Sequence, residues 1–370
     1  MRLQGVGRSH GALILALLAV AGCHSPARSV AIGFAFTYHL NAAISVAREE
    51  IALRRQGGGP QISIVYDSAM AGDPADVEVR RAERLAAVPG IVAVVGHSGS
   101  RASLAAAPVY NEAGIVQVTP NSTSRLLDSA GPWTFNLAPD DSVEGAFLAA
   151  FVAERLRASR VTIYYENDEY GTGLRDGAIA ALGQHGVAVL DRVPVDQTSD
   201  FRTLVAASLT RGVPDVVVVA GRQFEAGSIA RVMRERGVPR AVVAGDGALV
   251  LPLLTRTAGP AADSLYVVAF WMPDAPDSLS RAFVERYRRV AGELPQSADA
   301  MSHDALMLIA DAVRVVGPSP TAIRQYLREL GASRPPYEGV TGRISFGPHA
   351  RPRLVMAHVV GGRPRRVVGS

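Results

Sequence analysis

The chain has 370 residues, 48% of them hydrophobic, so it is a folded globular protein long enough for two lobes rather than a disordered chain. Its 38 basic residues are all arginines and nearly balance 34 acidic residues, which leaves a formal net charge of +4. Because the arginines do not form clusters interleaved with aromatic residues, the composition argues against nucleic-acid binding.

The N-terminus has the features of an export signal. Arg2 and Arg8 precede an apolar segment, residues 11–22, that is too short to span a bilayer. The single cysteine, Cys23, follows the sequence LAVAG, which resembles the bacterial lipoprotein signal, where the cysteine becomes the lipidated first residue. We therefore expect residues 1–22 to be a removed signal peptide, Cys23 to carry a lipid anchor, and the mature chain to face the periplasm or the cell exterior. Cleavage elsewhere, with Cys23 incidental, is the other interpretation.

Strands and helices are predicted to alternate through the first third of the chain. This alternation favours a parallel sheet with helices on both faces. An extended segment without periodicity, residues 132–139, follows, and we interpret it as the first crossing between two lobes. The strands are expected at residues 29–36, 61–67, 91–96 and 115–119, and the helices at 41–55, 76–87 and 100–112.

The same alternation starts again after the crossing and predicts a second lobe of similar size. A final strand at 265–270 precedes three helices without intervening strands, and we place these helices on the first lobe. The tail is predicted to form a hairpin of two strands, 342–346 and 353–360, around a turn at 347–350. Lobe 1 then takes residues 30–138 and 271–345, and lobe 2 takes 139–270 and 346–370. The other second-lobe strands are expected at 160–166, 187–193, 215–220 and 240–245, its helices at 142–156, 174–184, 201–209 and 225–236, and the three late helices at 279–291, 298–316 and 321–330.

The sequence offers little support for catalysis. Ser98 lies between a predicted strand and helix, as a hydrolase nucleophile would, but Ser100 stands where that turn needs a second glycine. His303 and Asp304 are adjacent and cannot face each other as base and orienting acid. The histidines lack metal-ligand spacing, and a chain without lysine has no Gly-Lys phosphate loop. We expect no catalytic residue, metal or cofactor, and a serine hydrolase is the least favoured alternative.

Four polar loops follow predicted strands at their carboxyl ends, where open α/β sheets bind ligands. They are residues 97–100, 121–124, 167–173 and 246–247, two from each lobe. The helix that begins at Ser100 would direct free N–H groups at an anion, for which Thr123 is a second donor. Asp246 would pair with an ammonium group, and Tyr170 would close over the ligand. Helix capping or turn formation is the other interpretation of each residue alone, and their joint placement favours a binding cleft.

These segments resemble the type I periplasmic binding proteins, specifically the leucine/isoleucine/valine-binding family that supplies amino acids to ABC importers. The resemblance implies two Rossmann-like lobes with parallel-sheet cores, joined by three crossovers, that close on a ligand in the cleft between them. The segments that carry the similarity are VVGHSGS, PVYNEAGIVQVTPNSTSRLL, NDEYGTGLRDG, DFRTLV and TGRISF.

The resemblance also implies roles for individual residues. Ser100 and Asn121 would hold the ligand carboxylate, Thr123 and Asp246 its α-ammonium group, and Tyr170 would lie against the ligand. Ser122, in the same loop as Asn121, is included among the expected ligand contacts.

Two further positions are left open by the sequence. Arg222 stands where relatives with aliphatic ligands have an aromatic residue, so it either meets a second anionic group of a polar ligand or pairs with Glu225 on the surface. Trp271 either lines the cleft or packs at the hinge. The loop at residues 36–40 is shorter than the family usually has, so that wall of the cleft is not predicted.

The function implied by the resemblance is that of a lipid-anchored binding protein of an ABC importer. It would capture an amino acid or similar small zwitterion by hinge closure and present it to a membrane permease. Alternatives on the same fold are a ligand sensor and a lipoprotein that activates cell-wall synthases.

Overall fold

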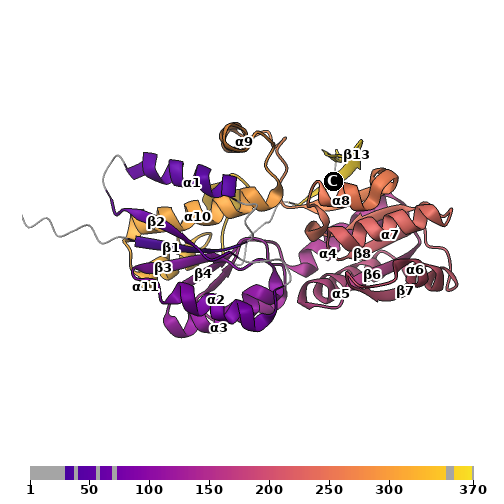
Figure 1. Ribbon diagram of the computed structural model, residues 1–370, viewed down its shortest axis with the longest axis horizontal. Coiled ribbons are helices and arrows are strands. Elements are labelled where there is room, and N and C mark those ends of the chain that lie inside the picture. Colours follow the sequence, from indigo (N-terminus) through magenta and orange to yellow (C-terminus); the bar gives the residue numbers. More distant parts are fainter. Residues whose placement is uncertain (1–29, 37–40, 56–58, 69–72, 347–353, 369–370) are drawn as a thin grey trace, which may run out of the picture.

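The computed structural model describes residues 30–36, 41–55, 59–68, 73–346 and 354–368. Two lobes lie side by side along the long axis of the molecule, each built on a sheet covered by helices (Figure 1). The expected signal peptide, Cys23, most of the short loop after the first strand and the expected turn at 347–350 lie outside the described residues.

The lobe 1 sheet has five parallel strands in the order β2-β1-β3-β4-β5. β1 and β3 lie inside this sheet and are buried almost along their whole length, as expected for apolar runs covered on both faces. β5, at the sheet edge, was not predicted as a strand, because its three residues pair only with β4 and have no periodicity. The strands are β1 (Val30–Ala35), β2 (Ile62–Tyr66), β3 (Ile91–Gly96), β4 (Val116–Thr119) and β5 (Thr134–Asn136), and the helices between them are α1 (Asn41–Arg54), α2 (Ala75–Ala86) and α3 (Ser100–Ala113).

Three late helices, α9 (Ser278–Ala291), α10 (Ser297–Val316) and α11 (Pro320–Glu329), return to lobe 1. α10 packs against α1 and β3, and its apolar face fills the centre of the lobe 1 core. In the described part of the chain, no single helix is long and apolar enough to cross a membrane, and the pair α10 and α11, which together have the length and composition, is bent by 110°.

The lobe 2 sheet has seven strands in the order β14-β13-β10-β9-β8-β6-β7. The strands β6 to β10 are parallel, whereas β13 runs antiparallel to β10 and β14 runs antiparallel to β13. The strands are β6 (Arg160–Glu166), β7 (Ala188–Val195), β8 (Val216–Ala220), β9 (Ala241–Ala244), β10 (Leu265–Ala269), β13 (Val355–Val360) and β14 (Arg363–Arg366), and the helices are α4 (Asp141–Ala150), α5 (Glu169–Gln184), α6 (Phe201–Leu209), α7 (Gln223–Glu235) and α8 (Leu253–Ala258).

The tail does not form the predicted hairpin. β12 (Gly342–Ile344) pairs antiparallel with β11 (Tyr337–Gly339) on the side of lobe 1, whereas β13 pairs with β10 and β14 in lobe 2. The prediction was wrong because each strand has a better partner. A short turn brings β11 to β12, and burial of Met356 and Val359 on the lobe 2 sheet fixes β13 there.

The chain passes between the lobes three times, after β5, after β10 and after β12. The first crossing leads into α4, which packs along α5 of lobe 2. The two-lobed α/β fold with three crossovers is therefore as predicted.

Candidate ligand-binding site

Ser100 joins two loops on the lobe 1 side of the crevice between the lobes. It is the first residue of α3, and Gly99 before it has a φ of +90°, which a residue with a side chain rarely adopts. The buried Ser100 hydroxyl accepts hydrogen bonds from the backbone N–H groups of Thr123 (3.3 Å) and Ser124 (3.2 Å). The loops after β3 and β4 therefore meet, as the sequence predicted.

The three residues after β4 differ in how they are placed. The Ser122 hydroxyl is buried and lies 2.8 Å from the hydroxyl of Ser103 in α3, so it faces the lobe 1 interior. Asn121 Oδ1 and Thr123 Oγ1 are buried and have no hydrogen-bond partner within the described structure. Buried acceptors without a partner are unfavourable, so these two oxygens suit a ligand donor better than Ser122 does.

Tyr170 and Asp246 meet on the lobe 2 side. Tyr170 is the second residue of α5, and its hydroxyl donates to Asp246 Oδ1 (3.1 Å) and accepts from the backbone N–H of Gly247 (3.0 Å). Asp246 directly follows β9 and the adjoining Gly245. The loops after β6 and β9 are thus joined side chain to side chain.

Arg222, at the start of α7, faces the crevice. Its guanidinium group lies over the ring of Tyr170, 5.1 Å from the centroid, and forms ion pairs with Glu166 and with Asp168 (3.0 Å). A Cβ added to Gly99 of lobe 1 would lie 4.0 Å from Arg222 Nη2, so this side chain reaches the opposite lobe. Arg222 therefore forms its ion pairs with Glu166 and Asp168, and Glu225, which also attracts it, is buried, so the predicted surface pair is wrong. Its contact with a second anionic group of a ligand stays a prediction.

Two acidic residues of the site, Asp141 and Glu144, were not predicted. Both lie in the first turn of α4, directly after the first crossing, and both are buried. The Asp141 backbone N–H donates to the carbonyl of Thr123 (2.7 Å), and Glu144 Oε1 accepts from the backbone N–H of Asp246 (2.7 Å). Their i, i+3 spacing places them on one face of the helix, and this was the signal available in the sequence. We call Asp141, Glu144 and Asp246 the acidic trio.

Burial makes the acidic trio difficult to ionise. Loss of solvent raises the pKa of Asp141 from 3.8 to about 7, with further repulsion from Asp246, although the nearby Thr123 hydroxyl opposes the shift. Burial likewise raises the pKa of Asp246 to about 6, against the hydrogen bond from Tyr170, and raises the pKa of Glu144 well above its usual value. The trio therefore needs bound protons or a bound cation near neutral pH.

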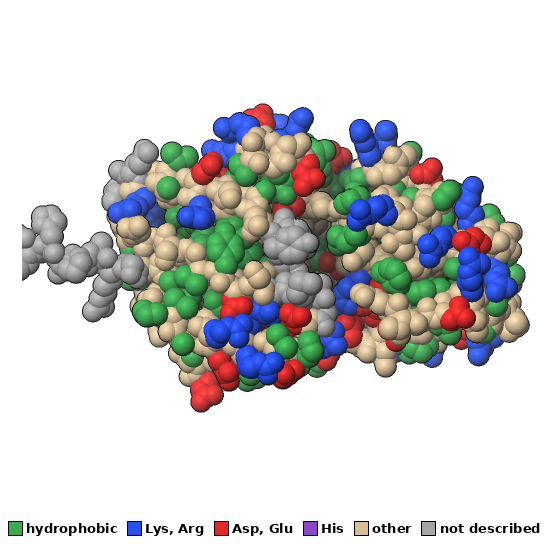
Figure 2. All heavy atoms as spheres, viewed as in Figure 1, with side chains coloured by type: hydrophobic (Ala, Val, Ile, Leu, Met, Phe, Trp, Pro, Cys, Tyr) green, Lys and Arg blue, Asp and Glu red, His purple; other side chains and the backbone are tan. Residues whose placement is uncertain are grey.

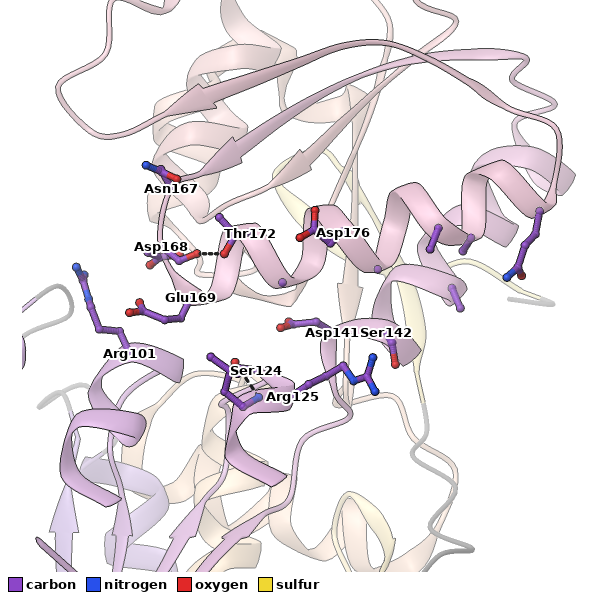
Figure 3. A pocket seen from close by; sticks show the side chains of 17 residues that line it. Arg101, Ser124, Arg125, Asp141, Ser142, Asn167, Asp168, Glu169, Thr172 and Asp176 are labelled. Carbon is purple, nitrogen blue, oxygen red and sulfur yellow. Dashed lines mark hydrogen bonds between the residues drawn. The ribbon is translucent and has the colours of Figure 1, made fainter. Parts of the chain in front are cut away.

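A cavity of about 750 Å³ opens beside the trio, between the lobes. Figure 3 shows Asp141, Asp168 and Glu169 pointing into it from α4 and the start of α5, with Arg101 and Arg125 on the lobe 1 side. In Figure 2, acidic and basic side chains gather along the lower part of the boundary between the lobes. The size is ordinary for a small-molecule site.

The predicted contacts lie directly behind the wall of this cavity. Ser124 and Asp141 line it, and these residues are hydrogen-bonded to Ser100 and Thr123. Glu144, in the same turn of α4 as Asp141, accepts from the backbone N–H of Asp246 (2.7 Å), which links the cavity wall to the Tyr170 side. Ser100, Thr123 and Asp246 thus converge on one crevice between the lobes.

A family model described as periplasmic binding protein matches residues 40–359. The chain belongs to the periplasmic binding protein family. This confirms the resemblance found in the loop sequences, and the family is one of substrate-binding proteins.

Relatives of this periplasmic binding protein include an amino acid binding protein from Pseudomonas aeruginosa, 30% identical over 319 residues that cover 86% of this chain and 83% of that protein. Leu/Ile/Val-binding protein homolog 1 of Brucella suis is 28% identical over 272 residues, which cover 72% of this chain and 71% of that protein. Among solved structures, an ABC transporter substrate-binding protein from Desulfitobacterium hafniense in complex with Leu is 27% identical with a TM-score of 0.78, covering 92% of this chain and 100% of that one.

The residues considered for catalysis are used differently in this periplasmic binding protein. His97 is buried, and its ring nitrogens contact Glu78 (2.5 Å) and the Tyr110 hydroxyl (2.8 Å), so it faces the lobe 1 interior rather than Ser98. His303 lies on α10 between Glu50 (3.5 Å) and Asp304 (3.6 Å), so the expectation that His303 and Asp304 cannot face each other was wrong. Across the described ranges, no group of three or more His, Cys, Asp or Glu is arranged to hold a metal ion.

Trp271 packs at the hinge. It follows β10 at the second crossing, is buried, and donates from its indole nitrogen to the Ser280 hydroxyl (3.1 Å). Its ring meets the edge of Phe283 within an apolar cluster of lobe 1. Of the two alternatives for this residue, packing at the hinge agrees with these contacts.

Proposed function

We propose that this periplasmic binding protein captures an amino acid or a similar small zwitterion between its lobes and presents it to an ABC permease, without catalysing a reaction. The observation that carries the proposal is the opposite chemistry of the two walls. Lobe 1 offers N–H and hydroxyl groups at Ser100 and Thr123, and lobe 2 offers the Asp246 carboxylate beside Tyr170. The names of the relatives, an amino acid binding protein and Leu/Ile/Val-binding proteins, support the same ligand class.

In this proposal the ligand carboxylate binds at Ser100 and Asn121, and its ammonium group binds at Thr123 and Asp246. The two N–H groups now satisfied by the Ser100 hydroxyl are suited to a carboxylate oxygen, and Thr123 Oγ1 is an acceptor without a partner within the described residues. Tyr170 lies against the ligand from lobe 2. Because one ligand contacts both walls, its binding favours the closed arrangement of the lobes.

The moving units in this proposal are residues 30–138 with 271–345 and residues 139–270 with 346–370. The three crossings between them act as the hinge, and α4 moves with lobe 2 because it packs along α5. Export with removal of residues 1–22 and lipidation of Cys23 would hold the protein at the membrane beside its permease. Release of a Cys23→Ala variant into the soluble fraction tests the anchor.

The ligand proposal is tested by isothermal titration of the mature protein with all amino acids, supported by thermal-shift measurements. At least one amino acid should bind and raise the melting temperature, and Asp246→Ala should weaken its binding by about 2–5 kcal/mol, because the ligand ammonium group loses its partner. If no amino acid binds, the proposal fails, and a protein partner in place of a small ligand becomes the better explanation.

A further inference from the structure

The acidic trio has more carboxyl groups than one ammonium group can pair with. Asp141 is 1% exposed and forms no ion pair within the described residues; the nearby Thr123 hydroxyl is the group that favours its charged form. Glu144 is fully buried, and its Oε2 is without a hydrogen-bond partner in the part of the chain that the structure describes. If an amino acid binds as proposed, its ammonium group pairs with Asp246, Glu144 stays hydrogen-bonded to Asp246, and Asp141 is left without a counter-ion.

Arg222 acts on only one member of the trio: its positive charge lowers the pKa of Asp246, and no ion pair joins an arginine to Asp141 or Glu144 within the described residues. The guanidinium group of Arg222 is held by ion pairs with Glu166 and Asp168. Burying a carboxylate without a counter-ion is unfavourable by several kcal/mol, so such a group is protonated or is matched by a ligand. A bound cation would stabilise the charged form of Asp141 and would offset its repulsion with Asp246.

The acidic surface continues from the trio into the cavity. Asp141 forms part of the cavity wall with Asp168 and Glu169, and Glu169 Oε2 is another buried oxygen without a partner in the described structure (Figure 3). The opposite, lobe 1 side carries Arg101 and Arg125. At about 750 Å³ the cavity has room for a side chain that extends from the trio along α5.

We infer that the ligand of this site carries a second cationic group in addition to its α-ammonium group, and that Asp141 receives it. The inference rests on the proposed function, the binding of an amino acid between the lobes. The ligand class it names is an amino acid with an ammonium or guanidinium side chain, in contrast to the leucine bound by the structural relative from Desulfitobacterium hafniense.

The test compares ligands that match in length and differ in side-chain charge. Lysine is titrated against norleucine and arginine against citrulline, with the mature protein at neutral pH and low salt. Each cationic ligand should bind at least about tenfold more tightly than its neutral counterpart, because an ion pair of the partly buried kind contributes 1.4 kcal/mol or more. Binding of the cationic ligands should also release protons from the trio, measured as a dependence of the binding heat on the ionisation enthalpy of the buffer.

Two variants assign the effect to Asp141. Asp141→Asn should remove most of the preference for lysine over norleucine, measured as the ratio of the two affinities in the same variant. Asp128→Asn removes the same charge from an exposed side chain of the lobe 1 segment Arg125–Ser129 and should leave the preference intact. Circular dichroism establishes that both variants are folded.

The outcomes separate this inference from the proposed function. If norleucine and citrulline bind as tightly as lysine and arginine, the inference is overturned and the proposed function stands. An undiminished preference in Asp141→Asn also overturns it. If neither the cationic nor the neutral amino acids bind, the proposed function itself is wrong.

Discussion

Ser100 shows how one hydroxyl group can organise a binding surface. By accepting from the N–H groups of Thr123 and Ser124, it holds the loop after β4 against the start of α3. Both N–H groups belong to buried residues, so they have little access to water when the hydroxyl is removed. The same oxygen therefore serves the stability of lobe 1 and the shape of the crevice.

We predict that Ser100→Ala lowers the free energy of unfolding by about 1–3 kcal/mol, because two buried donors lose their acceptor. Urea denaturation measures the change. Ser45→Ala is the matched control, since within the described residues the Ser45 hydroxyl donates to the carbonyl of Asn41 in its own helix at an exposed position (2.9 Å), and its loss should have little effect. Equal stabilities of the two variants would contradict a joining role for Ser100.

At the scale of single residues, the sequence indicated which loops meet but not which side of a loop each residue faces. Ser100 and Thr123 could be grouped, as could Tyr170 and Asp246, because the carboxyl ends of parallel strands lie at one edge of each sheet. The inward orientation of Ser122 could not be predicted, because it depends on its contact with Ser103. The positions of these residues agree with the expected ligand contacts, whose roles remain predictions.

The helix pair α4 and α5 positions the acidic trio. A Cβ added at Gly145 of α4 would lie 2.5 Å from the backbone nitrogen of Ala178 in α5, and one at Gly177 would lie 2.5 Å from the carbonyl oxygen of Asp141. The two backbones therefore approach more closely than side chains would allow. This close packing holds Asp141 over the first turns of α5.

We predict that Gly145→Ala destabilises the protein by about 1–3 kcal/mol, because the added methyl group must separate α4 from α5. Gly183→Ala is the control on α5, where a Cβ would meet no atom within 4 Å. That change should stabilise the protein by about 0.5–1 kcal/mol, since alanine favours helix more than glycine does. Melting temperatures compare the two, and a stable Gly145→Ala variant would show that the contact is not tight.

At the scale of elements, long periodic segments were predictable and short or glycine-containing ones were not. β3 occupies the predicted residues 91–96, whereas α5 begins at Glu169 instead of 174. Glycines at 171 and 173 suggested a loop, but Asp168 caps the helix through the N–H of Gly171 (2.8 Å). A Cβ at Gly173 would lie 2.1 Å from Asp141 Oδ2, so this glycine is needed for contact between helices. Such tertiary requirements have no local signature.

For the whole molecule, the acidic trio links stability to pH. The pKa of Asp141 is about 7 and that of Asp246 about 6 in the folded state, against 3.8 for an ordinary aspartate. Between these values the folded state retains protons that the unfolded state has lost, so stability due to these groups falls as the pH rises from about 4 to about 7 and then levels off.

We therefore predict that Asp141 makes the free energy of unfolding of the ligand-free protein smaller at pH 8 than at pH 5. Asp141→Asn should remove part of this decrease. The measurement is urea unfolding of both proteins at pH 5, 6, 7 and 8. Asp128→Asn, which changes an exposed carboxylate, should follow the wild type. Parallel curves for Asp141→Asn and wild type would mean that Asp141 is not held in a neutral form by the fold.

The two-lobed plan was predictable because the strand and helix alternation stops at the first crossing and starts again after it. The arrangement of the lobes across the crevice was not, since it depends on contacts such as Asp141 with Thr123 and Arg222 beside Gly99, which join distant parts of the chain. The partners of the tail strands were missed for the same reason.

The place of Trp271 makes lobe motion visible by spectroscopy. Its backbone continues from β10 of lobe 2, while its indole ring is buried in lobe 1 against Phe283. The chain has only one other tryptophan, Trp133, which lies within lobe 1 beneath Arg324. Intrinsic fluorescence of the unlabelled protein therefore combines a reporter at the pivot with an internal reference, and a change in its emission on adding solute would follow the rotation of the two halves in real time.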